Sequence, residues 1–350
     1  MKKGGRLVIV LGVLIAFGLL SWVAGAHFAQ ARAAAAEMSW SWATAALLCA
    51  LASHAMGGLA LAAILGLLGH ALGAPTVLAI ALVSTTANYI ISTGGVTGFA
   101  LKAHLLHKRQ VPIATTIVAS AVTSAIMYAV LTAVLAQGLA TLAFRMQGSR
   151  VGLVEGILGL VILLGAAGGL LALFLNGSLR MKAARKLFHW TNIAAFQMSR
   201  GEIPPENFMA FERQLSQGLL RIRNGKGRLT LALLYTCLDW GFALISLWLC
   251  FKAVGDPLPL GALSAVFAVG QGATLIPALP GGLGAAEGSM AAVLVALGYD
   301  GGRALVAALV FRVAYYLIPS LLSVFVLWGL KVSEPAVLSQ AAALGKELPQ

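Results

Sequence analysis

Charged residues are scarce in this sequence. Lysine, arginine, aspartate and glutamate make up 10% of its 350 residues, whereas a typical soluble domain carries about 25%. Hydrophobic residues make up 60% of the chain, and the mean hydropathy is +0.92. This composition excludes an ordinary soluble domain and predicts a helical protein that crosses the membrane several times.

Acidic residues are the rarer charged class, with 11 aspartates and glutamates against 24 lysines and arginines and a formal net charge of +13. In a soluble protein such a balance would indicate nucleic acid binding. Here the basic residues lie between apolar runs, where they set orientation in the membrane and contact anionic headgroups. We therefore expect a membrane lipid as partner and no nucleic acid.

Motifs of soluble chemistry are also missing. The three cysteines, Cys49, Cys237 and Cys250, lie within apolar runs without CxxC spacing, so neither a disulfide framework nor a zinc site is indicated. The sequence has no P-loop, nucleophile elbow, HExxH motif or pair of catalytic carboxylates. We expect no cofactor, no metal, no enzymatic activity and no ATP-driven transport in this chain.

The sequence does contain broken apolar hairpins. The stretch Pro277–Ser289 reads PALPGGLGAAEGS and lies between the apolar runs Leu258–Ile276 and Met290–Leu297. Proline lacks a backbone donor and glycine raises the entropy cost of a helix, so the tip cannot be helical throughout. The second arm is too short for a span, which takes roughly 20 residues. These features predict a re-entrant hairpin over Leu258–Leu297 with its tip in the membrane.

An earlier stretch repeats this pattern. The apolar run Pro75–Ile91 is followed by STGGVTGFALK, Ser92–Lys102, and by a short arm that ends at His107. The glycine pairs Gly94–Gly95 and Gly281–Gly282 mark the two corresponding tips. Two interrupted segments in corresponding places are the best sequence indication of a transport site.

Six longer apolar runs account for the rest of the membrane part. They are Leu7–Ala26, Ala43–Gly69, Pro112–Gly138, Val151–Leu175, Leu229–Phe251 and Ala304–Leu330. Two spans, a hairpin and a span are followed by the same four elements in the opposite sense. The sequence therefore predicts an all-α polytopic membrane protein with about six full spans plus two oppositely oriented re-entrant helical hairpins. Such an inverted repeat is the expected architecture for alternating access.

One polar, basic connection divides the chain. Residues 1–175 form the first membrane repeat, with its hairpin at 75–107, plus the fifth span; residues 229–330 form the second membrane half, with its hairpin at 258–297. Residues 176–228 are predicted to form a basic cytoplasmic loop with an amphipathic helix on the membrane surface, and residues 331–350 a cytoplasmic tail. The positive-inside rule then places the N- and C-termini in the cytoplasm of a multi-pass cell membrane protein.

Four ionisable residues fall inside apolar runs: His54, Asp239, Glu287 and Arg312. A charge at the bilayer centre costs at least about 2.5–3.5 kcal/mol, so each needs a partner or a wet cavity. Asp239, Glu287 and Arg312 are predicted at similar depth and are able to meet. They form either an ion pair that only pins helices together or an anion site in which Arg312 binds a phosphate and Glu287 orients it. We expect His54 to be a hydrogen-bonded core residue.

Each glycine pair is predicted to precede a short helix that begins inside the membrane. Unpaired backbone amides and the helix dipole at such a terminus favour a bound anion. Glycine also lets backbones approach closely, and this packing role does not exclude the first.

The run LIPALPGGLGAAEGSMAAVLVALG and the later run FRVAYYLIPSLL, Phe311–Leu322, resemble the transmembrane region of the lysylphosphatidylglycerol synthase/flippase family, also called the multiple peptide resistance factor family. Members typically read PGGLGxREG in the second hairpin and show a YR…P pattern in the last span. The residues of this chain on those positions are Pro280, Gly281, Gly282, Gly284, Glu287, Arg312 and Pro319.

The first hairpin, GGVTGFALKAHLL, is similar to the family's GxxGExxR segment. Gly98 matches and Lys102 replaces the arginine, whereas Phe99 stands where an acidic residue is usual. In the second hairpin, Ala286 replaces a usual arginine. The candidate substrate-binding residues from the ionisable groups and the resemblance are Gly94, Gly95, Gly98, Lys102, Asp239, Gly281, Gly282, Gly284, Glu287 and Arg312.

The resemblance covers nearly the whole chain and implies a function in lipid transport. Synthases of the family carry a soluble aminoacyl-transfer domain after the membrane region; only about 20 residues follow the last span here, so we expect a stand-alone translocation part. It implies a flippase-like lipid translocase that moves an anionic, aminoacylated or otherwise headgroup-modified lipid between leaflets. The alternative is a non-catalytic membrane accessory or scaffold for a lipid- or glycolipid-modifying enzyme. A homo-oligomer or such an enzyme partner is compatible with either function.

Overall fold

The computed structural model describes residues 28–90, 95–145, 225–274 and 284–332, together with the single residues 178, 182, 217, 218 and 221. All regular structure within these residues is helical, which confirms the predicted all-α class. The predicted spans Leu7–Ala26 and Val151–Leu175, and most of the basic loop, lie outside the described residues.

Four helical stretches of the described chain are long and apolar enough to cross a membrane: Trp40–Leu67, Ile113–Gly138, Lys226–Ala253 and Gly301–Leu330. They belong to α3 (Trp40–Leu67), α6 (Ile113–Arg145), α10 (Lys226–Ala253) and the continuous helix formed by α13 (Gly301–Arg312), the π-helix η2 (Val313–Leu317) and α14 (Ile318–Val332). At 1.5 Å per residue, about 26 residues extend roughly 39 Å, which exceeds the roughly 30 Å of a hydrocarbon core. Four of the six predicted spans are therefore present as helices of spanning length.

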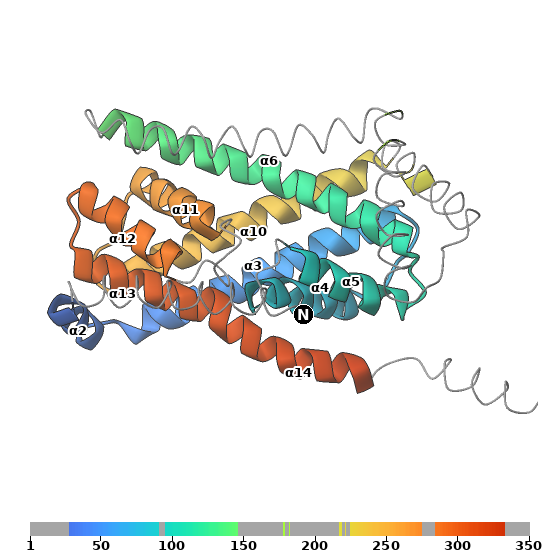
Figure 1. The fold of residues 1–350 in the computed structure, drawn as a ribbon, viewed down its shortest axis with the longest axis horizontal. Coiled ribbons are helices and arrows are strands. Elements are labelled where there is room, and N and C mark those ends of the chain that lie inside the picture. The colour runs from blue at the N-terminus through green and yellow to red at the C-terminus, as the bar shows by residue number, and fades with distance from the viewer. Residues whose placement is uncertain are drawn as a thin grey trace, which may run out of the picture.

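Four shorter helices form two pairs. In the first short pair, α4 (Ala74–Ile90) packs against α5 (Val96–His107); in the second short pair, α11 (Leu260–Thr274) packs against α12 (Ala285–Ala296). Figure 1 shows the first short pair at one end of the helical bundle and the second short pair at the other. A further short helix, α2 (Phe28–Ala36), packs against α13.

Helices α3 and α10 pack along their whole length and run antiparallel. Near the start of α3, the Ala46 carbonyl accepts a hydrogen bond of 2.8 Å from Ser246 near the end of α10. In the middle, Ser53 donates to Asp239. At the far end of α3, the Gly66 carbonyl accepts from Arg228, near the start of α10. This central pair carries Ser53, His54 and Asp239.

A tight turn sets α12 beside α13. Gly298 has a φ of +87°, a left-handed conformation that favours glycine, and the Tyr299 N–H bonds the Leu294 carbonyl at 2.9 Å, as in a Schellman motif. Asp300 then caps α13 by accepting from the Arg303 N–H at 2.7 Å. Because the two helices run antiparallel from this turn, the start of α12 lies beside the end of α13.

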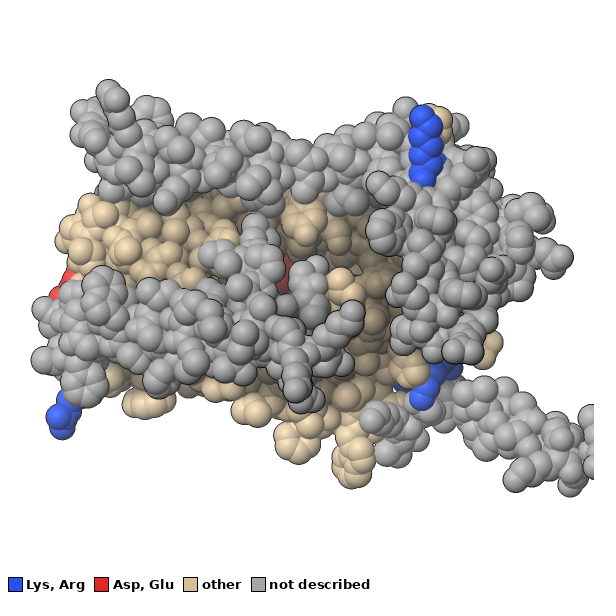
Figure 2. All heavy atoms as spheres, in the orientation of Figure 1, with Lys and Arg blue, Asp and Glu red and all other residues tan. Residues whose placement is uncertain are grey.

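Charged and apolar side chains are separated along the bundle. Figure 2 shows lysine and arginine side chains toward the ends of one face and mostly uncharged residues between them. At the end of α10, the Lys252 ammonium lies 3.6 Å from the centre of the Trp42 ring, a cation–π contact suited to a membrane interface. On α14, Leu321, Phe325 and Trp328 are exposed, as expected of a surface that faces lipid.

Candidate functional site

Glu287 and Arg312 form an ion pair at the junction of α12 and α13. The Arg312 Nε atom donates to Glu287 Oε1, and the two side chains are 11% and 3% exposed, respectively. Glu287 lies in the first turn of α12 and Arg312 is the last residue of α13, so the turn at Gly298 brings them together. The structure thus joins two of the three ionisable residues that the sequence placed at similar depth.

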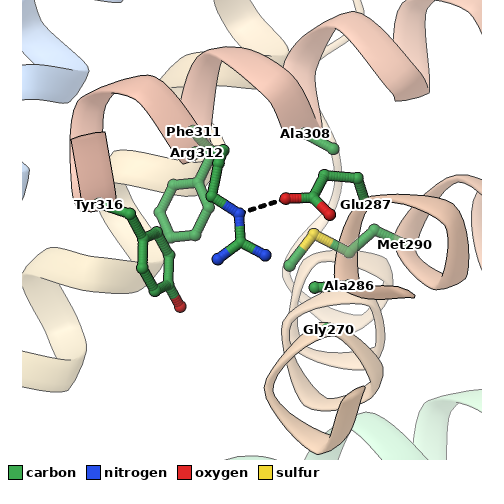
Figure 3. A pocket seen from close by; sticks show the side chains of 8 residues that line it. All are labelled: Gly270, Ala286, Glu287, Met290, Ala308, Phe311, Arg312 and Tyr316. Carbon is green, nitrogen blue, oxygen red and sulfur yellow. Dashed lines mark hydrogen bonds and ion pairs between the residues drawn. The ribbon is translucent and has the colours of Figure 1, made fainter. Parts of the chain in front are cut away.

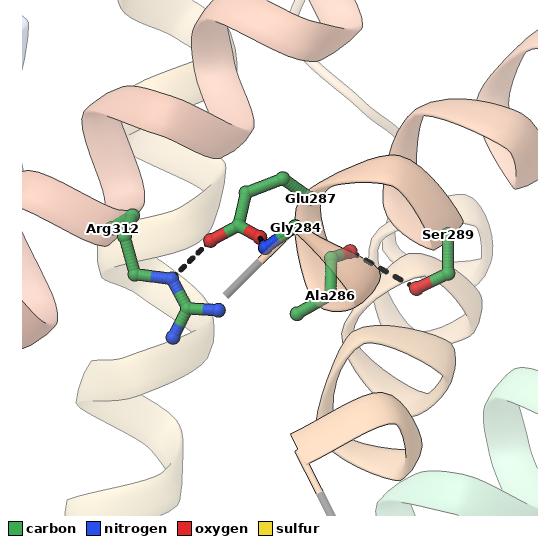
Figure 4. Close-up of polar contacts among 5 residues, drawn as sticks. All are labelled: Gly284, Ala286, Glu287, Ser289 and Arg312. Atoms are coloured by element: carbon green, nitrogen blue, oxygen red, sulfur yellow. Dashed lines mark hydrogen bonds and ion pairs between the residues drawn. The ribbon is translucent and has the colours of Figure 1, made fainter. Parts of the chain in front are cut away.

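Glu287 also caps its own helix. Its Oε2 atom accepts a hydrogen bond of 2.7 Å from the backbone N–H of Gly284, the N-cap residue of α12. Figure 4 shows the carboxylate between this N-cap and the guanidinium of Arg312. The helix dipole at the α12 N-terminus stabilises a negative charge there. A carboxylate of the chain itself therefore occupies part of the anion-binding capacity that the sequence predicted for this terminus.

The guanidinium of Arg312 points into a small pocket, shown in Figure 3. Its Cζ atom lies 4.2 Å from the centre of the Tyr316 ring, which is a cation–π contact. The pocket is otherwise mostly apolar; its lining residues are Gly270, Ala286, Glu287, Met290, Ala308, Phe311, Arg312 and Tyr316. A planar guanidinium held in this way presents donors that match a phosphate or carboxylate.

The first short pair is closed by an asparagine. The backbone N–H of Gly98, in the first turn of α5, donates to Asn88 Oδ1 of α4 at 2.7 Å. A Cβ atom at Gly98 would collide with the Ser84 carbonyl and the Asn88 side chain, so glycine permits this close approach. Lys102 is partly buried on α5, which packs against α4 and α6. The candidate residues of the first pair thus lie on different helices from Glu287 and Arg312.

The π-helix η2 places two tyrosines at the centre of the bundle. Pro319 has no N–H to bond the carbonyl four residues earlier, and that carbonyl, of Tyr315, instead lies 3.0 Å from His54 Nε2. Because a carbonyl only accepts, His54 donates here, which confirms its expected role as a hydrogen-bonded core residue. π-helical turns often occur at functional sites.

Asp239 lies in a neighbouring polar cluster. Ser53 Oγ donates to Asp239 Oδ1 and lies 2.9 Å from the Tyr315 hydroxyl. A Cβ atom added at Gly57, one turn further along α3, would lie 3.0 Å from Asp239 Oδ2, so glycine permits the carboxylate to approach the α3 backbone. Asp239 therefore does not join the Glu287–Arg312 pair, although it lies in the same part of the bundle.

Aromatic rings connect the two polar groups. The Tyr89 ring, at the end of α4, lies 4.5 Å from the ring of Tyr316 and 6.2 Å from the ring of His54. The rings of Tyr315 and Tyr316 are 5.3 Å apart. Tyr89 therefore brings the tip end of the first short pair to the side chain that stacks on Arg312.

The predicted site residues thus fall into four groups. Gly284, Glu287 and Arg312 lie together, and Asp239 is linked to them through the tyrosines. Gly95, the N-cap of α5, Gly98 and Lys102 lie at the first short pair. Gly94, Gly281 and Gly282 lie outside the described residues. Across the described ranges, no group of three or more histidine, cysteine, aspartate or glutamate residues is arranged to hold a metal.

Sequence reasoning missed Ser53, Tyr89, Tyr315 and Tyr316. The sequence did contain a signal for Tyr315 and Tyr316. Two adjacent tyrosines that follow an arginine and precede a proline are unusually polar for one apolar span, and their hydroxyl groups need polar partners there. Ser53 had no such signal, because serine and threonine hydroxyl groups in transmembrane helices commonly bond to their own backbone, as Thr123 and Thr132 do here. Tyr89 had none either.

The fold and the site define this chain as an all-helical membrane protein with a buried ion pair in its apolar core. The chain belongs to the family described as "Lysylphosphatidylglycerol synthase TM region", whose profile matches residues 9–323. This match confirms the resemblance seen in the second hairpin and the last span. Membership indicates a role related to membrane lipids.

Two relatives match shorter parts of the chain. A "UPF0104 membrane protein" of Methanothermobacter thermautotrophicus is 34% identical over 83 residues, which are 24% of this chain and 24% of that protein. Another UPF0104 membrane protein, from Pyrococcus horikoshii, is 26% identical over 138 residues, which are 39% of this chain and 40% of that protein. These matches span a quarter to two fifths of the relatives' length, and both relatives are described as membrane proteins.

Proposed function

We propose that this protein is a lipid translocase that moves an anionic or headgroup-modified lipid between leaflets, with Arg312 as the headgroup ligand. The observation that carries the proposal is the setting of Arg312: a cation in the apolar core, held at Nε by Glu287, whose guanidinium points into a pocket. The Glu287 charge is balanced by Arg312, and the α12 N-terminus adds roughly half a positive charge. The charges around the pocket therefore favour an anion such as a phosphate, and because the pocket is small the headgroup binds only when it widens.

An inverted repeat of re-entrant pairs is part of this proposal. Elements at equivalent positions in the two halves make equivalent contacts: α6 packs on α11 of the second short pair, and α14 packs on α4 of the first. The equivalent helices α3 and α10 pack on each other and run antiparallel. An in-plane two-fold axis relates elements in this manner and is typical of alternating-access transporters.

The proposed path needs no closed channel. The headgroup passes the Arg312 pocket while its acyl or prenyl tails stay in lipid, so the protein has to neutralise only the phosphate, whose charge is costly in hydrocarbon. The chain performs no covalent chemistry in this scheme and is therefore not an enzyme. The cargo is an anionic, aminoacylated or other polar-headgroup lipid of the cell membrane, and both termini face the cytoplasm.

Leaflet exchange in liposomes tests the proposal. Purified protein is reconstituted with a fluorescent anionic phospholipid, and a membrane-impermeant reductant then bleaches the outer leaflet. We expect wild type to expose inner-leaflet lipid to the reductant, and Arg312→Gln to slow this about tenfold or more, because a hydrogen bond to a charged group contributes about 1.5–3 kcal/mol. Arg303→Gln is the matched control, since Arg303 is an exposed cation in the first turn of the same helix, α13.

Two outcomes would count against the proposal. Equal exchange by wild type and Arg312→Gln would remove Arg312 from the headgroup site. An absence of exchange with anionic, aminoacylated and zwitterionic lipids, together with stable copurification of a lipid-modifying enzyme, would establish the accessory function in place of translocation.

A further inference from the structure

Asp239 is a second acidic residue in the apolar core, outside the Arg312 pair. Within the described part of the chain, its hydrogen-bond partner is the neutral hydroxyl of Ser53. Its Oδ2 atom lies close to the α3 backbone at Gly57, where a side chain would crowd it. A carboxylate at membrane depth without a paired cation is costly, so its environment favours a state in which the charge is neutralised by a ligand.

The hydrogen bonds around Asp239 are reversible without any movement of heavy atoms. When Asp239 is ionised it only accepts, so Ser53 donates to it and Tyr315 donates to Ser53 across 2.9 Å. When Asp239 carries a proton, it donates to Ser53, and Ser53 donates to Tyr315. Each hydroxyl has one hydrogen: in the first arrangement both are donated within the cluster, and in the second the Tyr315 hydrogen points out of it. The site therefore accommodates a proton by reversing hydroxyl directions alone.

Other titratable and charged groups reach this cluster from α3, α4, α13 and η2. His54 of α3 contacts the Tyr315 carbonyl and the Tyr315 ring, and Tyr89 of α4 contacts His54. On η2, Tyr316 is adjacent to Tyr315 and stacks on Arg312. Arg312 is itself paired with Glu287. Arg312, the cation closest to Asp239 in this series of contacts, is thus balanced by Glu287 and not by Asp239.

The Ser53–Asp239 contact lies where the two halves cross. These residues are 186 positions apart, and the first glycines of the two tip pairs, Gly94 and Gly281, are 187 apart (281 − 94). In an inverted repeat, each residue and its equivalent in the other half are separated by a nearly constant number of positions. Two equivalent residues that touch each other must lie close to the two-fold axis. Asp239 is therefore midway between the two faces of the repeat, the depth at which alternating-access proteins bind coupling ions.

We propose that Asp239 is a proton-binding site and that its protonation is coupled to headgroup binding at Arg312. One proton passes from hydronium on one side to an Asp239 oxygen and leaves to water on the other side; only O–H bonds form and break. Coupling runs through η2, because Tyr315 bonds Ser53 while the adjacent Tyr316 stacks on Arg312. The coupling rests on the proposed translocase function, whereas proton binding by Asp239 does not.

A metal ion fits this cluster poorly. Calcium takes 6–8 oxygen ligands, and among the described residues the hydrogen bonds of the cluster join three oxygen-bearing side chains, Asp239, Ser53 and Tyr315. The proton needs one oxygen. We therefore assign the proton, and the experiment below includes metal ions as a competing outcome.

Isotope-edited infrared spectroscopy tests proton binding directly, without a transport assay. The chain contains three aspartates, Asp239, Asp256 and Asp300, so carbon-13 aspartate labels few carboxyl groups. In lipid nanodiscs titrated from about pH 5 to about pH 9, we expect a labelled protonated-carboxyl band that declines as the pH rises. The band should be lost in Asp239→Asn, kept in Asp256→Asn and shifted in Ser53→Ala. A spectrum unchanged by Asp239→Asn would overturn the proposal, as would a band that responds to sodium or calcium rather than pH.

The coupling between Asp239 protonation and headgroup binding is measured in the same nanodiscs and in liposomes. Adding an anionic phospholipid should move the midpoint of the Asp239 band in wild type but not in Arg312→Gln. In liposomes, lipid exchange should depend on pH in wild type and lose that dependence in Asp239→Asn. Exchange that keeps its pH dependence in Asp239→Asn would refute the coupling. If no lipid is exchanged while the Asp239 band still titrates, the translocase proposal fails and the proton site stands.

Discussion

Glu287 binds Arg312 with one carboxylate oxygen and the N-cap of its own helix with the other. The pair thereby fixes the start of α12 against the end of α13 and aims the guanidinium at the pocket in Figure 3. A purely structural ion pair and an oriented anion ligand share this geometry, and the first two predictions separate them.

Removal of the arginine alone should destabilise the protein. Arg312→Ala leaves the Glu287 carboxylate buried without its cation, which costs about 3–5 kcal/mol. The double variant Glu287→Gln/Arg312→Met should recover most of that stability, because glutamine still accepts from Gly284 and methionine fills the space, yet it should not exchange lipid. Denaturant or thermal unfolding in detergent measures the first effect. A double variant as unstable as Arg312→Ala would show that the loss has another origin.

The aromatic ring beneath Arg312 should contribute to headgroup binding. Tyr316→Leu removes the cation–π contact of 4.2 Å, which stabilises such a pair by about 0.5–2 kcal/mol, so lipid exchange should fall by roughly 2- to 30-fold. Tyr316→Phe keeps the ring over the guanidinium and is the matched control. Equal losses in both variants would assign the effect to the hydroxyl instead.

Close packing of the first short pair depends on Gly98. Gly98→Ala should lower the free energy of unfolding by about 1–3 kcal/mol, because its Cβ meets backbone that has to shift. Gly227→Ala in the first turn of α10 is the control: a Cβ there has no neighbour within 4 Å, and alanine favours the helix. Thermal unfolding of the two variants in one detergent provides the comparison. Normal stability of Gly98→Ala would show that the two helices separate easily.

The proposed orientation predicts which loops are accessible from outside. In a background with Cys49, Cys237 and Cys250 replaced by alanine, an impermeant maleimide added to intact cells should label Asp300→Cys but not His107→Cys. Both positions are exposed and lie at opposite ends of the bundle in the inverted-repeat arrangement. Permeabilised cells should label both. Labelling of His107→Cys in intact cells would contradict the cytoplasmic termini and the opposite entry of the two pairs.

The spans and the chemistry of the second short pair were predictable from the sequence. Apolar length alone identifies α3, α6, α10 and the last helix, because a bilayer imposes a minimum number of residues. The pairing of Arg312 with Glu287 was one of two options for that cation. Depth estimated from helix ends could not separate Glu287 from Asp239, since depth says nothing of which face of α10 carries Asp239.

The polar cluster around Asp239 was not predictable in this way. It depends on a π-helical turn that rotates Tyr315 toward Ser53, and on contacts between residues up to 262 positions apart. Hydropathy treats tyrosine and serine as tolerated residues of a span and carries no information on their partners. The asparagine that closes the α5 terminus was missed for a similar reason, because Asn88 belongs to the preceding helix.

The shortness of α5 and α12 has an electrical consequence. Each has 12 residues, or about 18 Å of helix against a hydrocarbon core of about 30 Å. If the pairs enter from opposite faces as proposed, the N-termini of α5 and α12 reach similar depths near the middle of the core. Where water follows both pairs, the transmembrane voltage drops across the thin layer that stays dry. A charge that crosses only that layer then experiences most of the field, worth about 2.3 kcal/mol per 100 mV. Lipid exchange by this protein should therefore respond steeply to membrane potential whenever headgroup and proton carry net charge.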